Sequence, residues 1–147
     1  MNTRHLPPPT HEDAKLLLQL YEMRREPRLR EARQWFAASF RAKSFEELMK
    51  LCPPGSEQNA SYRMVTSYWE LVASLIATGV LSQELFFQTG RELLLCWMRI
   101  RDVAPHVRTH YRNPIEWKNL EIVAHAYVEW WNTNAPGAYD AFCERNK

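Results

Sequence analysis

The chain is poor in the residues that build disulfide frameworks and phosphate-binding loops. Its 147 residues include four glycines, too few to suggest a glycine-rich loop that cradles phosphate. The cysteines, Cys52, Cys96 and Cys143, are an odd set without CxxC spacing, so neither a disulfide framework nor a zinc knuckle is indicated. We therefore expect a reducing, cytoplasmic environment.

Signals for secretion, membrane insertion and catalysis are also missing. The N-terminal residues lack the apolar core of a signal peptide, and the longest apolar runs are far shorter than a membrane span. A formal charge of +2 predicts neither strong nucleic-acid affinity nor acidic disorder. No nucleophile elbow, P-loop or HExxH motif occurs, so we assign no catalytic residue and expect no cofactor.

The residues that are present have the periodicity of helices. Hydrophobic residues make up 46% of the chain and aromatic residues 12%, which is ample material for a core. Apolar side chains recur at helical spacing in six segments, and no segment alternates with the period of a strand. The sequence predicts an all-α protein, a single-domain helical bundle or irregular array of about six helices. Residues 1–9, which include three consecutive prolines, are expected to be a flexible tail before a helical domain at 10–147.

Capping residues and breakers predict where these helices begin and end. Helix starts are expected at Thr10, Ser44, Ser56 and Ser82, with Pro27 and Pro114 as first helical residues. Gly79 is expected to end the long central helix in a left-handed conformation. The helix that starts at Ser82 should run to about residue 104, and the helix that starts at Pro114 should cover residues 114–132.

The central helix carries the candidate polar site. It is apolar over most of its circumference, apart from one strip in which Glu70 lies among small residues that include Ser67 and Ser74. We expect a second helix to pack there and bury Glu70, which should then bind a basic or hydroxyl side chain from residues 99–112. A structural role is favoured over a catalytic or ligand-binding one, because perturbed carboxylates are often structural.

Two sets of residues have spacings that can bind metals. Glu121, His125 and Glu129 stand four apart on one helix, and His106 and His110 stand four apart upstream. For the first set, a surface ladder of ion pairs is the favoured interpretation. For the second, the nearby arginines oppose a cation, so adventitious binding of nickel or zinc is favoured over a physiological site.

Arginines are concentrated near the N-terminus. The group comprises Arg24, Arg25, Arg28, Arg30 and Arg33, interrupted by Glu22, Glu26 and Glu31. Without a recognised nucleic-acid-binding motif around them, the mixed charges indicate solvated helix faces.

The middle of the chain resembles a known family. Tyr68-Trp69-Glu70-Leu71-Val72-Ala73 is followed by Gly79-Val80-Leu81-Ser82, and later by Trp97, Pro105 and Trp117. This order, over residues 62–124, is similar to the bacterial domain-of-unknown-function family 4760, although Ser82 stands where that pattern has an acidic cap. The resemblance implies an all-α fold and no established activity, so it supplies no catalytic residues.

These observations favour a non-enzymatic interaction module that pairs with itself as a homodimer or with another protein. Adjacent Trp130 and Trp131 point about 100° apart on a helix, so one can cover the terminal helix while the other meets a second copy. The alternative is a small ligand-binding protein or enzyme with a polar pocket around Glu70. A nucleic-acid-associated accessory protein is the weaker third hypothesis.

Overall fold

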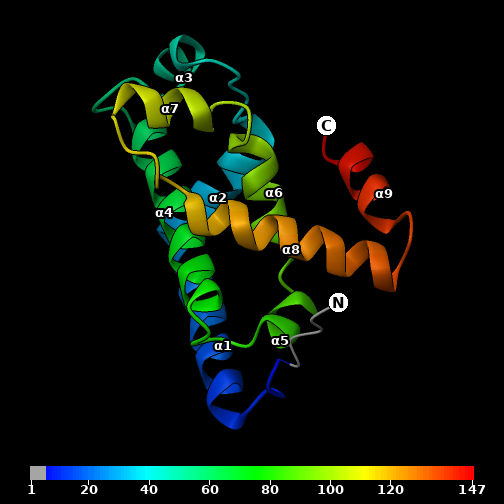
Figure 1. Ribbon diagram of the computed structural model, residues 1–147. Coiled ribbons are helices and arrows are strands. Elements are labelled where there is room, and N and C mark those ends of the chain that lie inside the picture. The colour runs from blue at the N-terminus through cyan, green and yellow to red at the C-terminus, as the bar shows by residue number, and fades with distance from the viewer. Residues whose placement is uncertain (1–5) are drawn as a thin grey trace.

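The chain folds into helices that pack against one long helix (Figure 1). The structure, a computed structural model, describes residues 6–147, and no strand occurs among them. The helices in chain order are α1 (His11–Arg24), α2 (Pro27–Ser39), α3 (Phe45–Leu51), α4 (Glu57–Ala77), α5 (Gln83–Phe87), α6 (Arg91–Ile100), α7 (Ala104–His110), α8 (Lys118–Asn134) and α9 (Ala138–Arg145). The all-α prediction is confirmed. The flexible tail stays a prediction, because residues 1–5 lie outside the described range.

The predicted caps account for most helix starts. The hydroxyls of Thr10, Ser44, Ser56 and Ser82 each accept a hydrogen bond from the backbone N–H three residues later, at 3.1–3.2 Å. Pro27 is the first residue of α2, where its missing N–H costs nothing. Gly79 follows α4 with φ +82°, so the left-handed stop is confirmed.

Two helix boundaries differ from the prediction. The helix expected from Ser82 to residue 104 is divided at Gly90 into α5 and α6. The ring of Phe86 lies against Gly90 so closely that an added Cβ would meet it at 2.3 Å. The break lets Phe86 and Phe87 both enter the core.

The other difference is at the start of α8. Residues 114–117 form a turn in place of the first helical turn expected from Pro114, and α8 begins at Lys118. Trp117, the residue before it, adopts a left-handed conformation with φ +56° that is costly for a bulky side chain. Its indole is buried and packs edge-on against Tyr62. Burial of this ring therefore overrides the local preference for a helix that starts at Pro114.

The core is built around α4. This helix packs most extensively on α2 and α8, and the buried apolar side chains form one cluster that extends from α1 to α9. Trp69 and Tyr127 are among the largest fully buried side chains, and Trp97 is also buried, as predicted. None of the helices in residues 6–147 combines the length and the hydropathy that crossing a bilayer requires.

The aromatic residues near the C-terminus pack within the chain. Trp131 covers α9 by contact with Tyr139 and Phe142, as expected. Trp130 packs against Phe87, and its indole N–H donates to the Glu84 carboxylate at 3.0 Å. Both tryptophans therefore have partners within the chain, and a contact between copies has to be sought elsewhere.

Replacing Trp69 by alanine should destabilise the protein by about 3–5 kcal/mol, since this substitution removes a fully buried large aromatic side chain from the centre of α4. Chemical denaturation measures the loss. Leu18→Ala is the control, because Leu18 is 69% exposed and its truncation should change stability by less than about 0.5 kcal/mol. Equal losses in the two variants would contradict the assignment of Trp69 to the core.

Arg112→Gly should raise the free energy of unfolding by about 0.5–1 kcal/mol. Arg112 is exposed, has φ +54°, and follows the end of α7, where its N–H donates to Thr109 and the next N–H donates to Arg108. Glycine is preferred at this position of a helix end because it has no Cβ to strain the left-handed conformation. Thr109→Gly, inside α7, should instead lose about 0.3–0.5 kcal/mol, the difference between the helix propensities of threonine and glycine. A loss of stability in Arg112→Gly would contradict the strain argument.

Candidate functional site

Glu70 binds the N-terminus of α8. One carboxylate oxygen accepts from the backbone N–H of Asn119 at 3.1 Å and from its side-chain amide at 2.9 Å. The other oxygen accepts from the backbone N–H of Leu120 at 2.9 Å. Glu70 is half-buried. The expectation of a basic or hydroxyl partner from residues 99–112 is therefore wrong: the partner is a helix end.

The local sequence explains why α8 needs this partner. The first turn of a helix leaves four N–H groups without internal acceptors. The residue before α8 is Trp117, whose side chain cannot cap, and α8 has no cap from its own N-terminal segment. A carboxylate satisfies two of these N–H groups and also interacts favourably with the positive end of the helix dipole. The arginines expected near Glu70 serve other groups: Arg99 donates to Ala37 O at 3.0 Å and Arg108 to Glu116 O at 2.8 Å.

A cleft of about 660 Å³ lies beside Glu70, and Ser67 and Ser74 line it as well. The predicted polar strip therefore faces one surface. The two hydroxyls donate to carbonyls of their own helix, Ser67 to Arg63 O and Ser74 to Leu71 O at 2.6 Å. The two serine hydroxyls and both Glu70 oxygens therefore already have hydrogen-bond partners. The surface that the cleft offers to a partner is largely apolar.

Aromatic and aliphatic side chains form much of the rest of this cleft. Leu71 and Tyr111 are exposed at its rim, and its buried apolar residues are Leu48, Tyr62, Val107 and Trp117. Burial raises the pKa of Tyr62 well above its usual range, which keeps its hydroxyl neutral. Sequence reasoning identified the polar strip and missed Leu48 and Tyr111, because they come from α3 and the α7–α8 turn.

The cleft also carries one cation and one carboxylate. Arg63 is exposed and Glu116 is half-buried. Among residues 6–147, neither takes part in an ion pair. Glu116 does accept a hydrogen bond from the side chain of Asn113 at 3.0 Å.

The candidate metal ligands are distributed over separate contacts. His106 is exposed on α7, and His110 stacks on Phe45 with ring centroids 3.9 Å apart. His125 packs edge-on against Trp97, and Glu129 is exposed. Within the described part of the chain, no group of three or more His, Cys, Asp or Glu side chains is arranged to hold a metal ion.

Glu121 binds two cations. Its carboxylate lies 2.9 Å from Lys118 Nζ and 3.4 Å from Arg108 Nη1. The hydrogen bond from Lys118, aided by the charge of Arg108, holds the pKa of Glu121 below its usual value. An ion pair is thus present here, although its partners differ from the ladder of His125 and Glu129 that the spacing suggested.

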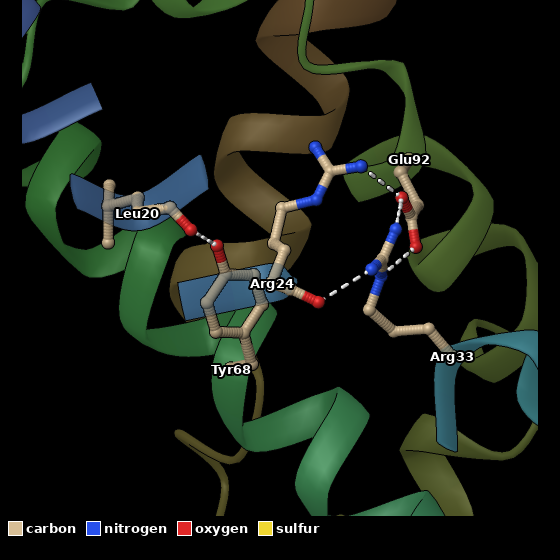
Figure 2. A network of polar contacts seen from close by, with 5 residues as sticks. All are labelled: Leu20, Arg24, Arg33, Tyr68 and Glu92. Atoms are coloured by element: carbon tan, nitrogen blue, oxygen red, sulfur yellow. Dashed lines mark hydrogen bonds and ion pairs between the residues drawn. The ribbon is translucent and has the colours of Figure 1, made fainter. Parts of the chain in front are cut away.

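The N-terminal arginines meet a carboxylate that the sequence did not associate with them. Figure 2 shows Arg24 from α1 and Arg33 from α2 on either side of Glu92 from α6. Arg33 donates to both Glu92 oxygens at 2.6 and 2.7 Å, and Arg24 donates at 2.7 Å. Arg33 also donates to the backbone oxygen of Arg24 at 2.9 Å, and Tyr68 from α4 donates to that of Leu20.

This network satisfies the carboxyl end of α1 and connects four helices. Beside it lies a second cleft of about 780 Å³, where Arg25 and Arg30 are also found. Sequence reasoning found the arginines and missed Glu92, because 59 residues separate it from Arg33. The one local feature of Glu92 is its position in the first turn of α6, where an acidic side chain interacts favourably with the helix dipole.

Comparison with known proteins identifies a family and adds no activity. The family model described as "Domain of unknown function (DUF4760)" matches residues 9–130, a wider span than the resemblance at residues 62–124. Neither the curated proteins nor the solved structures contain a significant match.

Glu70→Ala should lower the free energy of unfolding by about 1–2 kcal/mol, the range for losing a helix N-cap. This is less than the roughly 3–5 kcal/mol expected from the sequence, which assumed a buried cation left without a partner. Glu70→Gln should lose less, because one oxygen can still accept. Urea unfolding measures these losses, with Glu129→Ala on the exposed face of α8 as the control. If Glu70→Ala proves no more costly than this control, the carboxylate does not hold α8.

Proposed function

The chain belongs to the family described as Domain of unknown function (DUF4760), and from that premise we propose that it is a non-enzymatic interaction module that associates with a second copy of itself. The surface we assign to this contact is the cleft beside Glu70. We place the protein in the cytoplasm, where its three cysteines, none of them in a disulfide, remain thiols.

Exposed apolar side chains at the cleft carry this proposal. Leu71 is 46% exposed and Tyr111 is 60% exposed, and both line the cleft. Ile115, next to the cleft residue Glu116, is 72% exposed. Large apolar groups that surround a hollow with a buried aromatic floor are typical of a protein interface, since their burial is favourable and the hollow can receive a side chain.

The charges of the cleft favour a second copy as the partner. In a two-fold symmetric dimer, the same surface of each copy forms the contact. If one residue of the first copy contacts a second residue of the other copy, then the second residue of the first copy contacts the first residue of the other copy. Arg63 and Glu116 lie on the same cleft with opposite charges and without ion-pair partners among residues 6–147. Two copies can therefore form two Arg63–Glu116 pairs around the apolar contact.

The alternative of a ligand-binding protein or enzyme centred on Glu70 has less support. Both oxygens of that carboxylate already accept hydrogen bonds from α8. A substrate that binds this carboxylate would have to compete with the N–H groups that already donate to it. Among residues 6–147, no titratable side chain forms a hydrogen bond with Glu70 that would suggest proton transfer.

Sedimentation over a concentration series tests self-association. We expect a monomer–dimer equilibrium at micromolar concentrations. Leu71→Asp should abolish the dimer because it places a charge in the apolar contact, whereas Leu18→Asp on the exposed part of α1 should not. Arg63→Glu should raise the dissociation constant about tenfold or more through like-charge repulsion.

The double variant Arg63→Glu/Glu116→Arg gives the sharpest result. It exchanges the two charges, so a two-fold contact recovers both opposite-charge pairs and the affinity should return to nearly that of the unaltered protein. A strict monomer at high micromolar concentration would contradict the proposal. So would a double variant that dimerises as poorly as Arg63→Glu.

A further inference from the structure

The cleft of about 780 Å³ beside the Glu92 network has a marked excess of positive charge. Four guanidinium groups line it, from Arg24, Arg25, Arg30 and Arg33, together with the single carboxylate of Glu92. Arg30 is exposed and has no ion-pair partner among residues 6–147. Arg25 has only a loose contact with Glu22, at 4.0 Å between two exposed side chains.

The inner arginines are held in place. Arg33 uses its Nε and both terminal nitrogens for Glu92 and for the end of α1. Arg24 lies over the rings of Tyr21 and Trp69, at 4.8 and 5.4 Å from their centroids. Only one of its nitrogens binds Glu92, and Figure 2 shows the other terminal nitrogen directed away from that carboxylate. Arg24 can therefore donate to a ligand without losing its ion pair.

We propose that this cleft binds a small phosphate-bearing ligand through Arg24, Arg25 and Arg30. A phosphate group carries up to two negative charges and at least three acceptor oxygens. It can therefore accept from several guanidinium groups at once. A carboxylate has one charge and two oxygens, and Glu92 already occupies the arginines that fit it best.

The walls of the cleft add an apolar surface. Tyr21, which is 51% exposed, lines the cleft together with Leu95 and Phe142. A planar ring attached to the phosphate can stack on the phenol of Tyr21, as bases do on aromatic side chains. The chemistry of the cleft thus fits a nucleotide better than inorganic phosphate.

Calorimetric titration with pyrophosphate and with ATP tests the site. We expect saturable binding of one molecule per chain, which weakens as sodium chloride is added because the contacts are partly exposed. Arg30→Ala should weaken the binding of both probes about tenfold, and Arg112→Ala, a matched change of an exposed arginine outside the cleft, should leave it unchanged. Tyr21→Ala should weaken ATP binding and leave pyrophosphate binding unchanged.

Three outcomes would overturn the assignment. The first is that neither pyrophosphate nor ATP shows saturable binding below millimolar concentration. The second is an equal loss in Arg30→Ala and Arg112→Ala, which would indicate attraction by net charge. The third is binding of single-stranded oligothymidylate with an affinity that rises with length while ATP and pyrophosphate do not bind, which would identify the partner as nucleic acid. The arginine cleft shares no lining residue with the cleft beside Glu70. The outcome of the phosphate-binding experiment therefore does not test whether the protein forms a dimer.

Discussion

The fold depends on the need to satisfy the polar ends of many short helices. Each helix leaves N–H groups at one end and carbonyls at the other without internal partners, and a buried end without a partner is costly. Glu70 meets this need for α8 from the middle of α4. The same contact positions α8 across the central helix (Figure 1) and lets Trp117 keep a strained backbone while its ring is buried. One carboxylate therefore joins a helix start, a strained turn and a core contact.

Helix carboxyl ends are satisfied in the same way by donors from other helices. Arg33 donates to the final carbonyl of α1, Tyr68 donates to Leu20 one turn earlier, and Tyr127 donates to the final carbonyl of α5. Arg99, only 9% exposed, donates to the end of α2 and has no acidic partner among residues 6–147. Burial raises the pKa of Tyr127 to about 12, so this donor keeps its proton at any physiological pH. Tyrosine and arginine side chains can thus lie in the core, because backbone carbonyls of neighbouring helices accept their hydrogen bonds.

This use of polar side chains limits where function can be sought. Both oxygens of Glu70 accept hydrogen bonds from α8, so its cleft is better suited to apolar contact than to catalysis. Arg25 and Arg30 are the opposite case, because they line a cleft and are not part of the network that joins the helices. Self-association would use the exposed apolar rim around Glu70, and phosphate binding would use cations without close partners.

Local sequence patterns predict the helical class, most helix starts and the buried face of α4, because caps, breakers and periodic apolar residues act within one or two turns. Thr10, Ser56 and Gly79 behave as this local chemistry requires. The same patterns also place Glu70, Ser67 and Ser74 on one strip of α4, although this strip lines a cleft and only the start of α8 reaches Glu70. Only the tertiary structure decided which group binds Glu70, why α8 begins at Lys118 and which carboxylate joins Arg24 to Arg33. Those outcomes depend on contacts between residues about 50 or more positions apart, and no local pattern encodes which helix end will lie beside which side chain.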